Sequence, residues 1–125
     1  MIYGIGIDLR SIRRVQNIKD LNKFANKILT SDEIEYLGTL DQKNSVNYLA
    51  KQFAAKEALS KALGTGLIGD VKLNLIEIDR DQSGKPYIKM NDHMKTLLSK
   101  IGVNSTFVSL ADDSDFAVAT VILER

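Results

Sequence analysis

The sequence predicts a single α+β domain, residues 1–125, in which helices cover a mostly antiparallel sheet. Three observations favour this class: the first residues alternate like a strand, a long amphipathic segment fills the middle, and two hairpin-like pairs of apolar runs lie in the last half. Runs joined by short turns pair antiparallel, and helices between them pack on the sheet. The chain has 125 residues, one proline and no low-complexity run, which favours one core and no linker.

The first predicted element is a strand at residues 2–8. Ile5 and Ile7 lie on one face, and Gly4, Gly6 and Asp8 lie on the other. A face without side chains lets another element approach closely, so we expect a helix or strand against the glycines. Residues 11–28 then predict one helix or two short helices.

Two later helices have recognisable ends. The T-x-x-E spacing of Thr30 and Glu33 is a capping box and marks the start of one helix. The longest helix is predicted from about Ser45 to Leu63, where Gly64 ends it as a C-terminal glycine cap. The remaining predicted elements are strands at 73–79 and 86–90, a helix at 92–101, and strands at 105–111 and 115–123.

The long helix carries charges on its apolar face. At about 100° per residue, that face collects Val46, Leu49, Ala50, Phe53 and Ala54. The same stripe continues to Glu57 and Lys61, whereas Lys51 and Lys56 are expected to point elsewhere and to be solvated. An i, i+4 Glu–Lys pair stabilises an exposed helix by only ~0.2–0.5 kcal/mol, and burial would cost several kcal/mol per ion. We therefore expect these two charges to face a cleft or a ligand.

Asp8 is the candidate partner of Glu57, because it ends the glycine face of the first strand. Two neighbouring carboxylates repel unless a cation lies between them, and two carboxylates with water and phosphate oxygens are typical Mg²⁺ ligands. Lys61 would then lie near the phosphates and neutralise charge on a leaving oxygen. The alternative for Asp8 alone is a turn or helix-capping role. The glycines of GTG follow a helix, so any help to phosphate would come from close backbone approach or from Lys61.

The charge distribution narrows the possible partners. The net charge is +1, yet the segment between Arg10 and Thr30 holds six basic residues against one acidic residue. Such a segment is either a solvated helix face or a docking surface for an acidic partner. A nucleic-acid module is disfavoured, because the chain is nearly neutral and the basic segment lacks interleaved aromatic residues.

With no cysteine, no signal-peptide pattern and no apolar run of membrane length, we expect a cytoplasmic protein that uses neither thiols nor zinc–sulfur sites.

Several segments, in order, resemble the holo-acyl-carrier-protein synthases of the 4′-phosphopantetheinyl transferases. They are GIGID at 4–8, KILTSDE at 27–33, FAAKEALSKALGTG at 53–66, IEI followed by GKPY within 76–87, and VSL with DFAVATVILE near the end. The resemblance covers nearly the whole chain. It implies a ferredoxin-like α+β protomer and a homotrimer with sites at subunit interfaces.

The resemblance also implies a chemistry: phosphopantetheine moves from coenzyme A to a serine of apo-acyl carrier protein, and adenosine 3′,5′-bisphosphate is released, in support of fatty acid biosynthesis. Asp8 and Glu57 would hold Mg²⁺ with the pyrophosphate, Glu57 would help deprotonate the serine directly or through a metal-bound water, and Lys61 would stabilise or protonate the departing phosphate. The implied coenzyme A contacts are Lys61, Gly64, Thr65, Gly66, Pro86, Ser109 and Asp112. The implied carrier-protein contacts are Arg14, Lys23 and Lys27.

Two positions depart from the family pattern. Gln52 stands where members often have an arginine, and Asp112 stands where they usually have a histidine, preceded here by Ala111. Because those family residues would help hold phosphates, we expect retained activity with weaker coenzyme A binding. Alternatively, Asp112 adds a metal contact, or the loop moves and nearby lysines take over the phosphates. The rival function is a non-catalytic homologue that still binds carrier protein or coenzyme A. The single histidine, His93, is expected on a helix surface.

Overall fold

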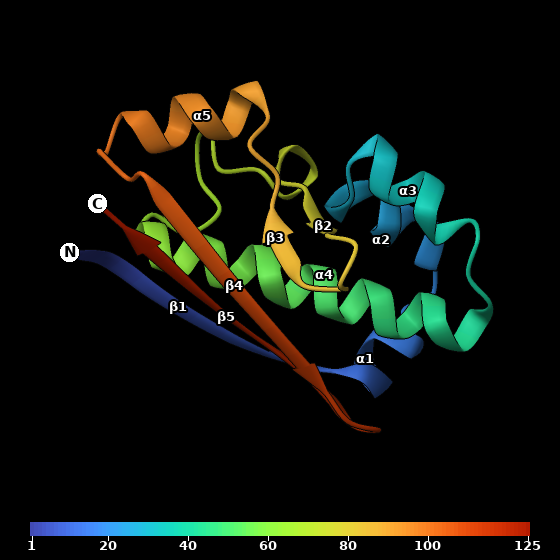
Figure 1. The fold of residues 1–125 in the computed structure, drawn as a ribbon. Helices are drawn as coiled ribbons and strands as arrows, with labels where there is room; N and C mark the ends of the chain where they lie inside the picture. Colours follow the sequence, from blue (N-terminus) through green and yellow to red (C-terminus); the bar gives the residue numbers. More distant parts are fainter.

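The computed structural model describes residues 1–125 and confirms the α+β class with a long central helix (Figure 1). The strands are β1 (Ile2–Ser11), β2 (Ile78–Arg80), β3 (Pro86–Ile88), β4 (Ser105–Asp112) and β5 (Phe116–Glu124). The helices are α1 (Ile12–Gln16), α2 (Leu21–Ile28), α3 (Ser31–Leu37), α4 (Gln42–Leu63) and α5 (Asp92–Ser99), with a 3₁₀ turn at Leu73–Leu75. None of these helices combines the length and apolar character that crossing a membrane requires.

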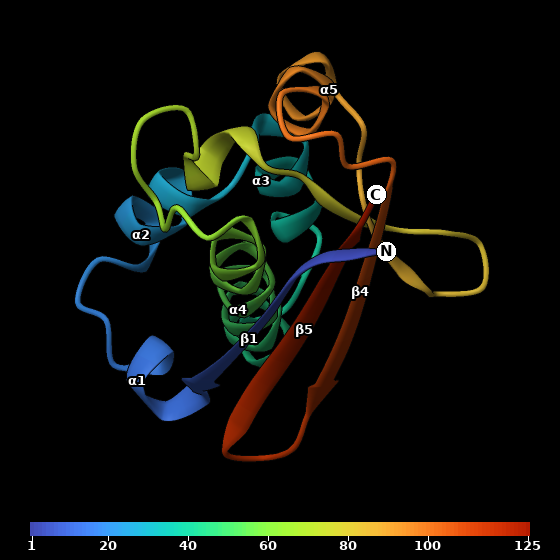
Figure 2. The ribbon, with the colours of Figure 1, turned by 90° about the vertical axis from the view of Figure 1, so that its left-hand side faces the viewer.

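The main sheet has three antiparallel strands in the order β1-β5-β4, and β2 and β3 form a separate hairpin. Figure 2 looks along α4 and shows the helix against one face of the sheet, with β1 and β4 at opposite edges. The chain ends meet at the far end of the sheet, where the Met1 amino group donates to the Arg125 carbonyl at 3.0 Å. Helix α4 covers only one face, so the other face has no cover within the chain.

The glycine face of β1 meets α4 as the sequence predicts. A Cβ at Gly4 would lie 1.9 Å from the Ala62 carbonyl oxygen, and a Cβ at Gly6 would lie 1.7 Å from that of Ala58. Because no side chain separates the two backbones, β1 and α4 touch directly. Asp8, the next residue on this face, therefore points at the helix just beyond the closest contact.

The helix ends follow the predicted signals. Residues 11–28 form two short helices, the Thr30–Glu33 capping box is present with both hydrogen bonds, and Gly64 closes α4 in the left-handed region at φ +80°. α4 begins at Gln42, three residues before the predicted start, because the side chain of Asp41 caps it by accepting the Asn44 N–H at 2.8 Å.

Strand β1 is longer than predicted and continues to Ser11, which caps α1. Asp8 consequently lies inside the strand and caps nothing, which removes the alternative reading of this residue. The predicted strand at 73–79 is wrong in its first half, which is a 3₁₀ turn, and pairing begins only at Ile78. His93 is half-buried rather than on the surface, and its Nε2 has no hydrogen-bond partner.

The expectation that Lys56 is solvated is also wrong. Its side chain is 0% exposed, forms an ion pair with Glu33, and donates to the carbonyls of Ile28 at 2.7 Å and Leu73 at 3.0 Å. Helices α2 and α3 and the 3₁₀ turn meet at this side of α4 and bury it. The periodicity of one helix cannot reveal this, because the covering elements come from elsewhere in the chain.

Candidate active site

The structure brings Asp8, Glu57 and Lys61 together at the edge strand of the sheet. Asp8 belongs to β1 and is only 6% exposed, while Glu57 and Lys61 lie one turn apart on α4. The Lys61 Nζ donates to the Asp8 Oδ1 at 3.2 Å and to the Ile7 carbonyl at 3.0 Å. The close packing of the β1 glycines on α4 fixes this arrangement, because it holds strand and helix at one separation.

A fourth member of the cluster, Arg10, was missed by the sequence analysis, which counted it only as part of the basic segment. Its Nε donates to Asp8 Oδ2 at 2.6 Å and its Nη2 to Asp8 Oδ1 at 3.2 Å, and Nη2 lies 3.9 Å from Glu57 Oε1. The guanidinium rests 4.2 Å from the centre of the Phe53 ring. The available signal was the i, i+2 spacing from Asp8, which puts both side chains on one face of a strand.

Asp8 and Glu57 fit a divalent cation that shares its coordination with a substrate. A single Arg10 nitrogen lies within 3.2 Å of one carboxylate and 3.9 Å of the other, so the two carboxylates face a common space. No group of three or more His, Cys, Asp or Glu side chains could hold a metal ion by itself. Mg²⁺ typically takes one or two carboxylates together with substrate phosphates and water, and this donor set matches that pattern.

The Gly64-Thr65-Gly66 loop continues directly from the lysine end of α4. The Gly64 N–H donates to the Lys61 carbonyl at 3.0 Å, and both glycines have positive φ, at +80° and +67°. Thr65 is exposed, and its Oγ1 hydrogen-bonds to the Gly66 carbonyl. The loop therefore presents backbone and a small hydroxyl side chain next to Lys61.

The other expected coenzyme A residues lie elsewhere in the chain. Pro86 begins β3, Ser109 is exposed on β4, and Asp112 ends β4. Strand β5 separates β4 from β1, so Asp112 is at the opposite sheet edge from Asp8. One protomer thus carries two separated groups of the predicted residues, one on each flank of α4.

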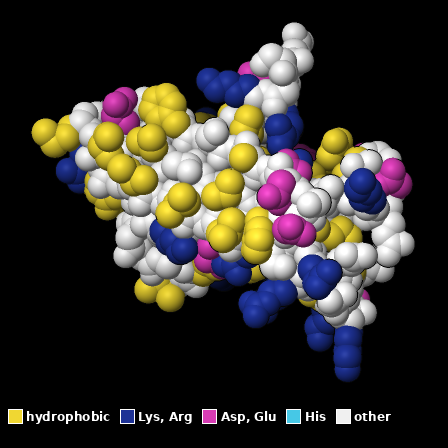
Figure 3. All heavy atoms as spheres, turned by 90° about the horizontal axis from the view of Figure 1, so that it is seen from below, with side chains coloured by type: hydrophobic (Ala, Val, Ile, Leu, Met, Phe, Trp, Pro, Cys, Tyr) yellow, Lys and Arg dark blue, Asp and Glu magenta, His cyan; other side chains and the backbone are white.

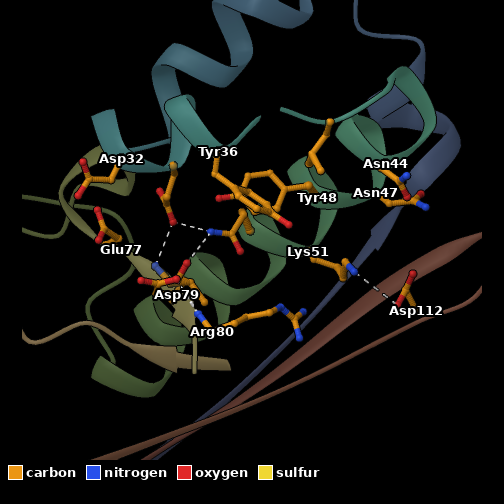
Figure 4. A pocket seen from close by; sticks show the side chains of 14 residues that line it. Asp32, Tyr36, Asn44, Asn47, Tyr48, Lys51, Glu77, Asp79, Arg80 and Asp112 are labelled. Atoms are coloured by element: carbon orange, nitrogen blue, oxygen red, sulfur yellow. Dashed lines mark hydrogen bonds and ion pairs between the residues drawn. The ribbon is translucent and has the colours of Figure 1, made fainter. Parts of the chain in front are cut away.

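Asp112 borders a pocket of about 640 Å³ (Figure 4). Its walls come mainly from α3, the first half of α4 and β2. Lys51 and Arg80 are its two cationic residues, and the Lys51 Nζ lies 3.9 Å from Asp112 Oδ1. Burial, with Glu33 as a smaller contributor, raises the pKa of the Tyr48 hydroxyl in the wall, so Tyr48 stays protonated.

Gln52 borders the same pocket, but its amide is already engaged. Its Nε2 donates to Glu33 and, at 3.0 Å, to the Ile78 carbonyl, and the side chain is almost fully buried. Gln52 therefore belongs to the buried network around Glu33, and the effect of this position on coenzyme A binding stays a prediction. Burial lowers the pKa of Lys56 in that network, and the neighbouring Glu33 opposes the shift.

The basic segment lies beside the Asp8 cluster. Arg14 on α1 and Lys23 and Lys27 on α2 are exposed, and no carboxylate lies within ion-pair distance of them. Figure 3 shows lysine and arginine side chains projecting from the end of the molecule that carries α1. Phe24 of α2 packs edge-to-face on Phe53, with the ring centroids 5.3 Å apart, and the Arg10 guanidinium lies over the Phe53 ring. The basic helix is thereby connected to the carboxylates by direct contacts.

Two carboxylates and a lysine at a strand–helix junction are the residue types that metal-assisted phosphoryl transfer uses. The family model described as 4′-phosphopantetheinyl transferase superfamily matches residues 4–121. The chain belongs to that superfamily, and the family predicted from the sequence is confirmed.

Individual relatives match over their full lengths. The chain is 41% identical over 126 residues to the holo-[acyl-carrier-protein] synthase of Buchnera aphidicola subsp. Baizongia pistaciae, covering 98% of each chain. The crystal structure of holo-[acyl-carrier-protein] synthase from Neisseria meningitidis superposes with a TM-score of 0.92 at 39% identity, covering 100% of both chains. The Bacillus anthracis synthase, solved in complex with CoA (3′,5′-ADP), has a TM-score of 0.84 at 36% identity, covering 99% of this chain and 97% of that one.

Proposed function

We propose that this protein is a holo-acyl-carrier-protein synthase. It transfers 4′-phosphopantetheine from coenzyme A to a serine of apo-acyl carrier protein, with Mg²⁺, in the cytoplasm and in support of fatty acid biosynthesis. The observation that carries the proposal is the convergence of Asp8, Glu57 and Lys61 at one site in a chain of this superfamily. Relatives solved with coenzyme A or its 3′,5′-ADP portion support the substrate.

The reaction replaces a phosphoanhydride bond of coenzyme A with a phosphate ester to the carrier serine. The carrier serine oxygen attacks the phosphorus that bears pantetheine, the bond to the adenosine-side phosphate breaks, and the serine proton is released. Glu57, whose side chain is 20% exposed, accepts that proton, and Lys61 donates to the departing phosphate oxygen. Asp8 orients the side chains of Arg10 and Lys61, because it accepts a hydrogen bond from each of them. When bound to Asp8 and Glu57, Mg²⁺ would polarise the pyrophosphate and offset its charge.

The complete site is formed by two subunits. Asp8, Glu57, Lys61 and the Gly64–Gly66 loop lie at one sheet edge, and Pro86, Ser109 and Asp112 lie on the other flank of α4. One coenzyme A molecule can contact both groups if a second copy brings its β4 edge to the first copy's β1 edge. This arrangement supports the homotrimer that the family resemblance implies.

The uncovered face of the sheet supports the same assembly. Ile5, Ile7 and Leu9 on β1, with Phe107 on β4 and Phe116 on β5, are each about half exposed or more. A monomeric soluble protein rarely leaves such a contiguous apolar area uncovered. Analytical ultracentrifugation should find a trimer, and Ile7→Lys should shift it toward monomer and lower the transfer rate.

The carrier protein docks on the basic helices. Acyl carrier proteins are acidic, and Arg14, Lys23 and Lys27 offer unpaired positive charge beside the Asp8 cluster. Charge complementarity of this kind mainly increases the association rate and weakens with salt. We expect Lys23→Glu to raise the Michaelis constant for carrier protein and leave that for coenzyme A unchanged.

The test is a mass measurement. The protein is mixed with apo-acyl carrier protein, coenzyme A and Mg²⁺, and the carrier should gain the mass of phosphopantetheine. Asp8→Ala should abolish the gain and keep the fold. If no acyl carrier protein gains mass, the synthase proposal fails, and the rival non-catalytic binding role becomes the better account.

A further inference from the structure

The Arg10 guanidinium contacts Asp8 and approaches Glu57, the two carboxylates proposed to bind the divalent cation. The guanidinium donates to both oxygens of Asp8, through Nε to Oδ2 and through Nη2 to Oδ1, and the same Nη2 reaches toward Glu57. The Lys61 ammonium donates a further hydrogen bond to Asp8 Oδ1. The two carboxylates are thus already neutralised by two side-chain cations of the same chain.

We propose that Arg10 is a displaceable internal counter-ion of the Asp8–Glu57 pair, which competes with the divalent cation and sets how much cation the enzyme needs. The inference rests on the proposed function, because the cation is that reaction's cofactor. Mg²⁺ bonds to oxygen at about 2.0–2.1 Å and tolerates little distortion of its octahedron. The three hydrogen bonds from Arg10 and Lys61 leave Asp8 about one free acceptor site. The guanidinium and a cation bound there would repel each other, so the two compete for Asp8.

The surroundings of Arg10 allow it to move. The Arg10 side chain is 32% exposed, and its guanidinium is held only by Asp8, the longer approach to Glu57, and the Phe53 ring. No backbone carbonyl accepts from it. The face of Phe53 keeps a favourable contact for the cation after Asp8 is released, so displacement needs a side-chain rotation and no backbone change.

The Arg10 contact has a consequence for the free enzyme as well. Without a cation, Asp8 and Glu57 would repel each other across their shared space, and the guanidinium removes that repulsion. Arg10 therefore keeps both carboxylates aimed at the site before the cation arrives. It is a positioning residue of the empty site and a competitor during loading.

The experiment measures Mn²⁺ binding, by the electron paramagnetic resonance signal of the free ion, in the full-length protein with saturating coenzyme A, whose phosphates complete the coordination, and without carrier protein. The same concentration of coenzyme A without protein gives the background. Arg10→Gln should lower the dissociation constant for Mn²⁺ by at least about tenfold, because a positive charge leaves the site. Arg10→Lys should lie between wild type and Arg10→Gln, since a single ammonium cannot cover both Asp8 oxygens. The matched control is Arg13→Gln, which removes the same charge from an exposed α1 residue without a carboxylate partner and should bind Mn²⁺ like wild type.

Adding Asp8→Asn to Arg10→Gln should abolish the gain in Mn²⁺ affinity. That result would show that the additional binding takes place at the Asp8–Glu57 site. The proposal is overturned if Arg10→Gln binds Mn²⁺ no more tightly than wild type, if neither protein binds the ion, or if the gain survives Asp8→Asn. Thermal unfolding of each variant shows that the folded protein is being measured. A tenfold gain with no phosphopantetheine transfer to any carrier protein would keep the counter-ion role and reject the synthase function.

Discussion

Lys56 and Glu57 are adjacent residues of α4 with opposite surroundings. Lys56 is fully buried, and its ammonium is shared among Glu33 and two backbone carbonyls. The Glu57 side chain is 20% exposed, and its nearest cation, on Arg10, lies at 3.9 Å. A buried charge with every hydrogen bond satisfied is committed to the fold, whereas a partly exposed charge with open bonding capacity is available for a ligand. The number of hydrogen bonds already formed therefore distinguishes Lys56, a charge that supports the fold, from Glu57, a charge proposed to act in the reaction.

The two sides of α4 differ in the elements that pack against them. The Lys56 side is closed by α2, α3 and the 3₁₀ turn, which wrap over the helix and seal the Glu33 network. The Glu57 side is held open because the β1 glycines bring the strand backbone against the helix and leave Asp8 and Arg10 at the margin. Close backbone contact thus positions the site without covering it.

The largest expected effect is on stability, at Lys56. Lys56→Met leaves Glu33 buried without its counter-charge and should lower the free energy of unfolding by about 3–5 kcal/mol. Urea denaturation measures it, with Lys51→Met, a half-buried lysine of the same helix, as the matched control that should change it by less than about 1 kcal/mol. The double variant Lys56→Met/Glu33→Gln should lose less than Lys56→Met alone. Equal losses at Lys51 and Lys56 would remove the distinction between them.

The second expected effect is on rate, at Glu57. Glu57→Gln removes the proposed proton acceptor and one proposed cation ligand, and it should lower kcat by about 10²–10⁴-fold. The rate is the time course of carrier-protein mass gain at saturating coenzyme A. A variant with nearly normal kcat would show that another group takes the serine proton.

A smaller stability effect is expected at Gln52. Gln52→Leu leaves Glu33 and the Ile78 carbonyl without one donor each and should cost about 1–3 kcal/mol. The Michaelis constant for coenzyme A should not change, because the amide faces the buried network. A raised Michaelis constant for coenzyme A with unchanged stability would show that Gln52 contacts the substrate.

The smallest effect concerns Asp112, whose ion pair with Lys51 is long and partly exposed. Asp112→His removes a negative charge next to the expected phosphate position and frees Lys51, so the Michaelis constant for coenzyme A should fall by about two- to fivefold. Steady-state kinetics at saturating carrier protein measure this. No improvement would mean that Asp112 does not oppose the phosphates.

Local patterns predicted most of the fold and the core of the site. The glycine face of β1, the Thr30–Glu33 box and the Gly64 cap each act within a few residues, so the sequence displays them directly. The apolar stripe of α4 pointed to Glu57 and Lys61 by the same kind of local reasoning, and Asp8 does meet Lys61.

Long-range packing decided what the sequence could not show. Lys56 and Gln52 donate to Glu33, which lies 23 and 19 residues away along the chain. Arg10 joins the site because β1 runs on through Ser11 instead of ending at Asp8. These outcomes depend on which elements meet, and helical periodicity describes one element at a time.

The most direct test measures both properties on both neighbours. Lys56→Met and Glu57→Gln are each assayed for phosphopantetheine transfer to apo-acyl carrier protein and for free energy of unfolding. We predict that Glu57→Gln loses transfer while its unfolding free energy stays within about 0.5 kcal/mol of wild type. We also predict that Lys56→Met loses several kcal/mol of stability and that its remaining folded fraction still transfers. A Glu57→Gln protein that transfers normally, or that loses as much stability as Lys56→Met, would contradict the assignment of Glu57 to catalysis.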